Sequence, residues 1–203
     1  MKLSIVSLGI SNLGSLQEAL RRIGASCGLI NTAQEICRAH SLVLPGVGAF
    51  QEGMASLHRQ GLVAPLVDYA ASGRPLLGIC LGMQLLFKKS HEQGEHVGLG
   101  ILPGEVKKLT LPTPNFRLPH MGWADVRSTT MGQDLLGERE EAYYFLHSYV
   151  AEPELPNHLA ATFDFGDPRA AAVRRDLTFG VQFHPEKSGD AGLDLLQRFL
   201  RLS

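Results

Sequence analysis

The chain has 203 residues, of which 44% are hydrophobic and 19% charged, a composition typical of one globular domain with a sizeable core. A formal net charge of −1 gives no electrostatic basis for binding nucleic acid or an acidic membrane surface, and no apolar stretch approaches the ~18–20 residues that span a bilayer. The N-terminus lacks a signal peptide's cleavage pattern, and the three cysteines fit neither a disulfide framework nor a zinc site, so we expect a single domain over residues 1–203 in the reducing cytoplasm, without a metal.

Strand and helix patterns alternate along the first part of the chain. Helical spacing of apolar residues from Leu13 to Ile23 stops at Gly24, and residues 62–73 predict another helix. Four apolar runs predict buried strands, at residues 2–9, 25–30, 41–50 and 74–80. This alternation predicts a three-layer, doubly wound α/β sheet, mostly parallel, in which sites gather at the carboxyl ends of the strands.

The second half of the sequence has a different pattern. Residues 104–126 and 141–166 alternate in polarity and contain prolines, which predicts antiparallel strands and loops added to the core. Residues 177–186 predict one more buried strand that ends in a polar cluster, and residues 193–202 predict a closing amphipathic helix.

The glycine-containing stretch "GISNLG" (9–14) lacks the ending of a phosphate loop and the spacing of a dinucleotide fingerprint. A tight turn from strand to helix is the better interpretation. No ATP site or other cofactor site is apparent elsewhere in the sequence.

Cys80 differs from the other two cysteines in its surroundings. Cys27 lies in an apolar strand pattern and Cys37 in a helical one, so both are expected to act as small hydrophobes. Cys80 stands between Gly78 and Gly82 where a strand meets a helix, the form of a nucleophile elbow. The positive end of that helix favours a thiolate. The alternative, on this pattern alone, is a packed cysteine.

A nucleophilic thiol needs a base, and His184 is the candidate because it lies just past a buried strand. Pro185 stiffens the link to Glu186, whose carboxylate would orient the imidazole. A surface or capping His-Pro-Glu is the alternative. Since Cys80 and His184 would each end a central strand, the two together indicate a Cys-His-Glu triad.

Acyl chemistry also needs donors for the developing oxyanion. The Leu81 N–H at the start of the helix is one candidate. The "PGVG" segment (45–48) offers another at Gly48, since glycines can turn their peptide N–H groups toward a neighbouring site.

These motifs carry a family resemblance. "GICLGMQ" (78–84), followed about a hundred residues later by His184-Pro185-Glu186, resembles the class I (triad) glutamine amidotransferases. Further motifs resemble the glutaminase subunits of imidazole glycerol phosphate synthase, which serve histidine biosynthesis: "LPGVGAF" (44–50), "PHMGW" (119–123), "HSY" (147–149) and "GVQFHPEKSG" (180–189). One departure is "SLGISN" (7–12), where that family usually has Asp-Tyr-Gly followed by Gly-Asn.

The resemblance implies hydrolysis of L-glutamine to glutamate and ammonia by Cys80, His184 and Glu186. It also implies that glutamine is bound by Gly46, Gln84, Ser148 and Tyr149. Because the chain has no phosphate loop and no spare domain, the ammonia must be used by another protein, which the resemblance identifies as a (β/α)₈-barrel cyclase subunit in a heterodimer. Its interface would include Trp123, Tyr144 and Lys187.

Two alternatives remain at the level of sequence. The chain could be a glutaminase subunit of another amidotransferase or a related thiol hydrolase, although "HPEKS" and "LPGVGAF" disfavour this. It could also be a non-catalytic binding protein on the same scaffold, which the intact triad disfavours.

Overall fold

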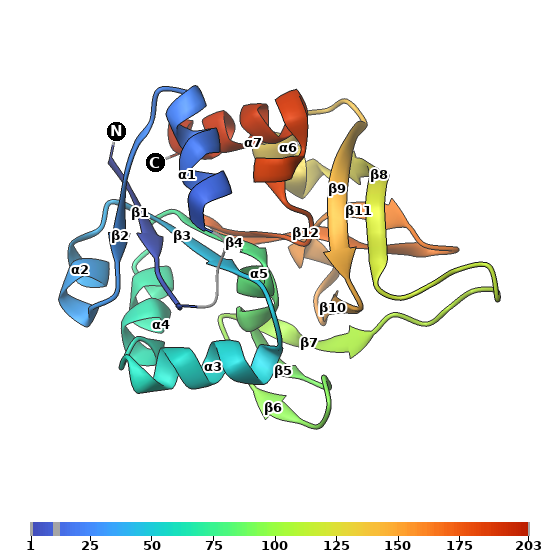
Figure 1. The fold of residues 1–203 in the computed structure, drawn as a ribbon, viewed down its shortest axis with the longest axis horizontal. Coiled ribbons are helices and arrows are strands. Elements are labelled where there is room, and N and C mark those ends of the chain that lie inside the picture. Colours follow the sequence, from blue (N-terminus) through green and yellow to red (C-terminus); the bar gives the residue numbers. More distant parts are fainter. Residues whose placement is uncertain (1, 10–12, 203) are drawn as a thin grey trace.

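The computed structural model describes residues 2–9 and 13–202 of the chain. Over these residues, nine strands form one sheet (Figure 1), whose spatial order is β2 (Ser26–Ile30), β1 (Lys2–Val6), β3 (Ser41–Gly46), β4 (Leu76–Cys80), β13 (Thr178–Val181), β12 (Pro168–Arg175), β11 (Leu159–Asp164), β8 (His120–Ser128) and β9 (Glu141–His147). The first five strands are parallel, and each strand from β12 to β9 is antiparallel to its neighbour. The predicted α/β class with a parallel core and added antiparallel strands is therefore confirmed.

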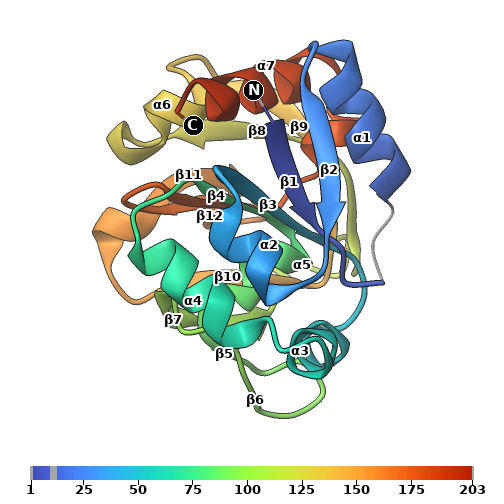
Figure 2. The ribbon, with the colours of Figure 1, turned by 90° about the vertical axis from the view of Figure 1, so that its left-hand side faces the viewer.

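Helices cover both faces of the parallel half, giving three layers (Figures 1 and 2). One face carries α1 (Leu13–Arg22) and α7 (Gly189–Arg201), and the opposite face carries α2 (Ala33–Arg38), α3 (Phe50–Arg59), α4 (Val63–Ala71) and α5 (Leu81–Leu85). The short helix α6 (Gln133–Leu136) packs beside α7. In the described part of the chain there are also three 3-10 turns, η1 (Thr130–Gly132), η2 (Pro156–His158) and η3 (Pro185–Lys187).

Side chains of the central strands point alternately to the two faces of the sheet and pack into two apolar cores, one on each face. Val43 and Leu77 point into the core beneath α1 and α7, whereas their neighbours Leu44 and Leu76 point into the core beneath the other helices. Strands buried on both faces must be apolar at every position, which is why these segments read as continuous apolar runs.

A second sheet packs beside α5, with the order β10 (Tyr149–Pro153), β7 (Leu102–Lys108), β5 (Phe87–Ser90) and β6 (His96–Val97) among the described residues. The sequence did not predict it as a separate sheet. Its inner side chains, including Phe87, Leu102 and Val106, join the core that also contains α3 and α4.

Two expectations about burial are wrong. The strand at 26–30 is present, but it forms an edge of the sheet, so its residues are exposed or half-buried rather than buried. Cys37 is exposed on α2 instead of filling space in the core, and Cys27 is half-buried.

The departure from the family pattern at residues 7–12 lies partly outside the described residues, since 10–12 are not described. Leu8 is buried, and its carbonyl accepts a hydrogen bond from Ser56 Oγ at 2.7 Å.

Candidate active site

Cys80 ends β4 in a backbone conformation that side chains rarely adopt. Its φ is 53° and its ψ is −110°, and α5 begins at the next residue. A non-glycine residue held at positive φ is strained, and such strain persists only where the surrounding structure enforces it. This sharp turn directs the thiol away from the strand and over the start of the helix, as a nucleophile elbow requires.

The two flanking glycines are required by close backbone packing. A β-carbon at Gly82 would overlap the Leu44 carbonyl oxygen of β3, and one at Gly78 would lie 2.8 Å from the carbonyl of Gly82 and the Cα of Met83. Glycine at both positions therefore lets α5 fold back directly against the sheet, which fixes where the Cys80 sulfur lies.

His184 and Glu186 follow β13, the strand next to β4 in the parallel register. His184 Nδ1 donates a hydrogen bond to Glu186 Oε1 at 2.8 Å, and both side chains are almost fully buried. Since Nδ1 is held by the carboxylate, Nε2 is the ring nitrogen left to face Cys80.

The electrostatics of this cluster favour a proton on His184. Burial lowers the pKa of the imidazole, but hydrogen bonds with Cys80 and Glu186 and their charges outweigh burial and raise the pKa to about 10. An imidazole held between a thiol and a carboxylate in this way can take the proton of the thiol and later return it to a leaving group.

A cavity of about 420 Å³ opens directly onto Cys80 and His184. The two candidate oxyanion residues, Gly48 and Leu81, line it, as do the candidate substrate residues Gln84, Ser148 and Tyr149. Gly48 has a φ of 101°, a conformation open mainly to glycine, and Leu81 is the first residue of α5. The structure thus brings together residues between positions 48 and 184 that are far apart in sequence.

Gly46 does not line this cavity. It pairs in register with Cys80 at the end of β3, packs against the Leu81 side chain, and borders a separate space of about 30 Å³ beside His184 and Glu186.

Three further residues of the site were not singled out from the sequence. Glu92 lines the cavity, and its Oε2 accepts a hydrogen bond from the Phe50 N–H at 2.7 Å. His147 lines the same cavity and donates from Nδ1 to the Tyr149 carbonyl at 2.8 Å. Gln182 is fully buried and donates to Cys80 Sγ at 3.7 Å. A signal existed for Gln182, because it lies in the motif at 180–189, two residues before His184.

The candidate interface residues lie together on a neighbouring surface. Trp123 of β8 pairs in register with Tyr144 of β9, and their rings meet edge to face with centroids 6.1 Å apart. Lys187 Nζ lies 5.7 Å from the centre of the Tyr144 ring. Trp123 is 58% exposed and Met121, on the same strand, 62%.

Within the described residues no cluster of three or more histidine, cysteine, aspartate or glutamate side chains could hold a metal ion. In the same part of the chain, no helix has both the length and the apolar composition to cross a membrane.

Comparisons with known proteins match nearly the whole chain. The family model "Glutamine amidotransferase class-I" matches residues 4–202. The chain is 44% identical to "Imidazole glycerol phosphate synthase subunit HisH" of Rhodopirellula baltica over 197 residues, covering 97% of this chain and 96% of that one. It is 43% identical to the subunit of the same name from Desulfitobacterium hafniense over 198 residues, covering 97% and 92%.

Solved structures show the same fold at lower identity. A "Crystal structure of glutamine amidotransferase" aligns with a TM-score of 0.76 and 21% identity, covering 98% of this chain and 97% of that one. The "Structure of PurLQS from Thermotoga maritima" aligns with a TM-score of 0.76 and 18% identity, with the same coverage.

Proposed function

The chain belongs to the class I glutamine amidotransferases, among the HisH subunits of imidazole glycerol phosphate synthase, and we propose that its catalytic residues are Cys80, His184 and Glu186. It is the glutamine-hydrolysing subunit of that synthase and serves histidine biosynthesis. We place it in the cytoplasm, as one amidotransferase domain spanning residues 1–203.

The observation that carries the assignment of residues is the joint position of the thiol and the imidazole. Cys80 ends β4 and His184 follows the adjacent parallel strand β13, both line one cavity, and the imidazole is held by a buried carboxylate. In the proposed reaction the Cys80 sulfur attacks the side-chain amide carbon of glutamine, and His184 passes its proton to the leaving nitrogen. Ammonia departs and a glutamyl thioester remains, which water hydrolyses to glutamate with return of the thiol proton. Glu186 orients and stabilises the imidazolium.

The N–H groups of Leu81 and Gly48 are proposed to stabilise the tetrahedral oxyanion. Backbone groups of Ser148 and Tyr149 would bind the amino-acid end of glutamine, with Gln84 beside them. Gly46 would contribute indirectly, by its packing against the Leu81 side chain. The Glu92 carboxylate suits the positively charged α-amino group, because it is the acidic side chain that lines the same cavity.

The ammonia is proposed to pass to a cyclase subunit with a (β/α)₈-barrel fold. Neutral ammonia is a nucleophile, whereas the ammonium ion that forms in water near neutral pH is not, so direct transfer prevents loss. Trp123, Tyr144 and Lys187 are proposed to lie at that interface. Their support is a contact between the exposed Trp123 ring and the half-buried Tyr144 ring, with the Lys187 ammonium near the latter. Lys187 directly follows Glu186, and the Tyr144 carbonyl accepts a hydrogen bond from the His184 N–H.

A test of the nucleophile compares three cysteine variants. Cys80→Ala should abolish glutamate release, while Cys27→Ala and Cys37→Ala, which remove thiols outside the cavity, should leave it within about twofold. In complex with the cyclase, Cys80→Ala should still support synthesis from added ammonium salts, because the cyclase chemistry lies on the other chain. Glutamine turnover retained by Cys80→Ala would refute the assignment.

A further inference from the structure

Gln182 is a fully buried polar side chain that the proposed mechanism does not use. Its backbone N–H is already paired with the Ala171 carbonyl at 2.8 Å, so the side chain is not needed to complete the sheet. Burying an amide costs free energy unless its donors and acceptor are hydrogen-bonded, and a methionine or leucine would fill this volume without that cost. The partners of the amide therefore indicate why a glutamine stands here.

A chain of hydrogen bonds fixes which way the amide points. Gln84 Nε2 donates to the Tyr149 carbonyl at 3.1 Å and to Gln182 Oε1 at 2.9 Å. A carbonyl can only accept, so Gln84 must turn its NH₂ group toward Tyr149, and that NH₂ has a second hydrogen for Gln182. Gln182 must then turn its own NH₂ group toward Cys80, where Nε2 lies 3.7 Å from Sγ. The orientation follows from an obligatory acceptor at one end of the chain and not from the amide assignment alone.

The same Tyr149 carbonyl accepts a second hydrogen bond, from His147 Nδ1. The substrate-facing strand β10, the helix α5 and the nucleophile are thus joined by side chains that are nearly or fully buried, at positions 84, 147 and 182. Buried hydrogen bonds of this kind are strong, whereas Nε2 on the other side of the His147 ring is buried without a partner among the described residues.

We propose that Gln182 is a positioning residue, which donates a hydrogen bond to the Cys80 sulfur and holds it ready for attack, with Gln84 and the Tyr149 carbonyl fixing its orientation. This inference rests on the proposed role of Cys80 as nucleophile. Gln182 and His184 approach the sulfur from one segment of chain, two residues apart. The amide donor stabilises the thiolate that remains after the proton has moved to His184, and it restricts the sulfur to one side-chain rotamer.

Gln182→Met tests this proposal, because methionine has similar volume but no hydrogen-bond donor. The experiment uses a subunit that carries Cys27→Ala and Cys37→Ala, so that Cys80 is the remaining thiol, and iodoacetamide as an uncharged probe. We expect Cys80 alkylation at neutral pH to slow roughly ten- to hundredfold, the range for loss of one hydrogen bond to a charged group, with the pH profile of alkylation displaced to higher pH. The kcat for glutamine hydrolysis should fall by a similar factor. A packing role would lower stability without displacing that pH profile.

Gln60→Met is the matched control. Gln60 is partly buried and, like Gln182, donates a side-chain hydrogen bond, from Nε2 to Ser56 Oγ at 2.9 Å, but it caps the end of α3 away from the cavity. Its alkylation rate and kcat should stay within about twofold of the parent. If Gln182→Met does not fold, Gln84→Met decides, since it releases the Gln182 amide from its anchor without replacing Gln182 itself, and it too should slow alkylation.

The proposal is overturned if folded Gln182→Met is alkylated at the parent's rate. If Gln182→Met does not fold, the proposal is overturned when Gln84→Met is alkylated at the parent's rate. Alkylation measures the thiol without requiring glutamine turnover. A failure of the Gln182 proposal is therefore distinct from a failure of the nucleophile assignment, which the Cys80→Ala assay reports.

Discussion

His147 shows how a buried titratable side chain can serve the site without changing charge in catalysis. Burial lowers the pKa of its imidazole to about 3, and the hydrogen bond to the Tyr149 carbonyl only partly offsets this. The ring is therefore neutral near pH 7, with its proton on Nδ1. Its hydrogen bond holds Tyr149 at the start of β10, directly after Ser148.

A neutral buried histidine predicts acid sensitivity of the fold. The unfolded chain takes up a proton at this ring near pH 6.5, whereas the folded protein does so only near pH 3, so His147 destabilises the fold progressively as pH falls between these values. His147→Asn keeps a donor for the Tyr149 carbonyl but does not titrate. Between pH 6.5 and pH 5, urea unfolding should show the parent losing about 2 kcal/mol more stability than this variant, at ~1.4 kcal/mol for each pH unit.

The control for that measurement is His58→Asn, at an exposed position on α3. It should lose stability with pH as the parent does. Equal acid sensitivity of the parent and His147→Asn would contradict the placement of a neutral, buried His147.

The sequence was informative about residues whose backbone is special and uninformative about residues defined by distant contacts. The glycines around Cys80 and the Pro185 link carry local signals, and the strand-to-helix junction at Cys80 is confirmed. The roles assigned to these residues stay predictions. Glu92 and His147 lack such signals, because their positions depend on which loop and which strand fold beside Cys80. Sequence spacing alone does not contain that information.

Among the elements, the loop after β3 has features that would let it change conformation. Val47 is 39% exposed, Gly48 has positive φ, and a β-carbon at Gly48 would meet no atom closer than 3.7 Å. A glycine in open space can rotate its peptide at little cost, which would move an N–H into or out of the oxyanion site. This loop is therefore the expected place for control of glutaminase activity by the cyclase and its ligand.

Gly48→Ala tests the loop, because alanine disfavours the observed φ while fitting the available space. We expect kcat for glutamine hydrolysis by the liganded complex to fall roughly 10²–10³-fold, the value of one oxyanion donor, with a much smaller change in KM. Gly73→Ala is the control, since Gly73 also has positive φ and open surroundings but lies beyond α4. A proportional loss in both variants, or a loss confined to KM, would count against a role of Gly48 in the oxyanion hole.

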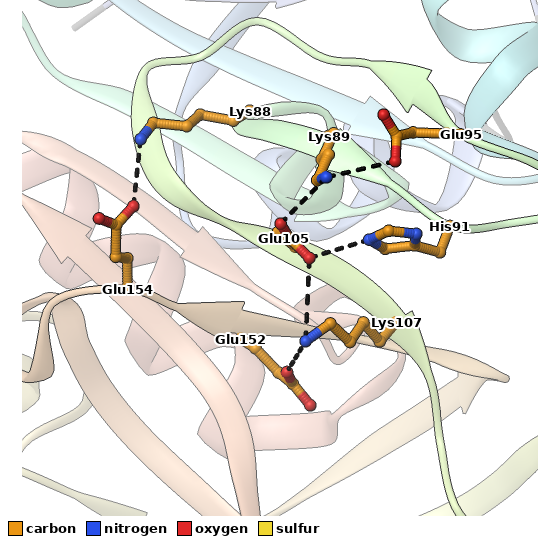
Figure 3. Close-up of polar contacts among 8 residues, drawn as sticks. All are labelled: Lys88, Lys89, His91, Glu95, Glu105, Lys107, Glu152 and Glu154. Atoms are coloured by element: carbon orange, nitrogen blue, oxygen red, sulfur yellow. Dashed lines mark hydrogen bonds and ion pairs between the residues drawn. The ribbon is translucent and has the colours of Figure 1, made fainter.

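The small sheet illustrates what polarity patterns leave undetermined. The alternation at residues 104–126 correctly indicated strands, but β7 joins β5 and β10 instead of the main sheet. Its outer face carries an ion-pair network centred on Glu105, which contacts Lys89, His91 and Lys107 (Figure 3). Hydrogen bonds from His91 and then Lys89 lower the pKa of Glu105. Exposed pairs contribute little stability, so the apolar face beneath β5 and β7 determines where this sheet packs.

On the scale of the whole molecule, the parallel half was predictable, whereas for the antiparallel half the presence of strands was predictable but their pairing was not. Continuous apolar runs specify strands buried on both faces. The extension from β12 to β9 depends on pairings between distant segments, such as β11 with β8, for which no local signal exists. That extension carries Trp123 on β8 and Tyr144 on β9, two residues of the proposed interface.

The proposed interface is connected to the triad through the backbone. The His184 N–H donates to the Tyr144 carbonyl at 2.9 Å, and the Tyr144 N–H donates to Ser188 Oγ at 3.0 Å. Ser188 Oγ in turn donates to the His184 carbonyl at 2.6 Å. A partner bound at β9 or at Lys187 would therefore contact the segment that holds the His184 imidazole, the proposed catalytic base.

This connection predicts that docking and coupling share residues. Trp123→Ala should weaken binding of the cyclase roughly thirtyfold or more, as expected for an aromatic anchor at the centre of an interface, while unfolding of the free subunit changes little because the ring is largely exposed. Lys187→Ala should reduce the fraction of ammonia delivered to the cyclase more than it reduces affinity, since Lys187 directly follows Glu186.

The controls are Leu29→Ala on the edge strand β2 and Lys88→Ala on the small sheet, both exposed and outside the proposed surface. Titration of each variant with the cyclase gives the affinity, and the ratio of imidazole glycerol phosphate formed to glutamine consumed gives the coupling. Suppose that Trp123→Ala binds the cyclase as tightly as Leu29→Ala does, and that Lys187→Ala transfers ammonia as fully as Lys88→Ala does. Removal of the aromatic ring and of the neighbouring charge would then have lowered neither affinity nor coupling, so the cyclase must dock on another face.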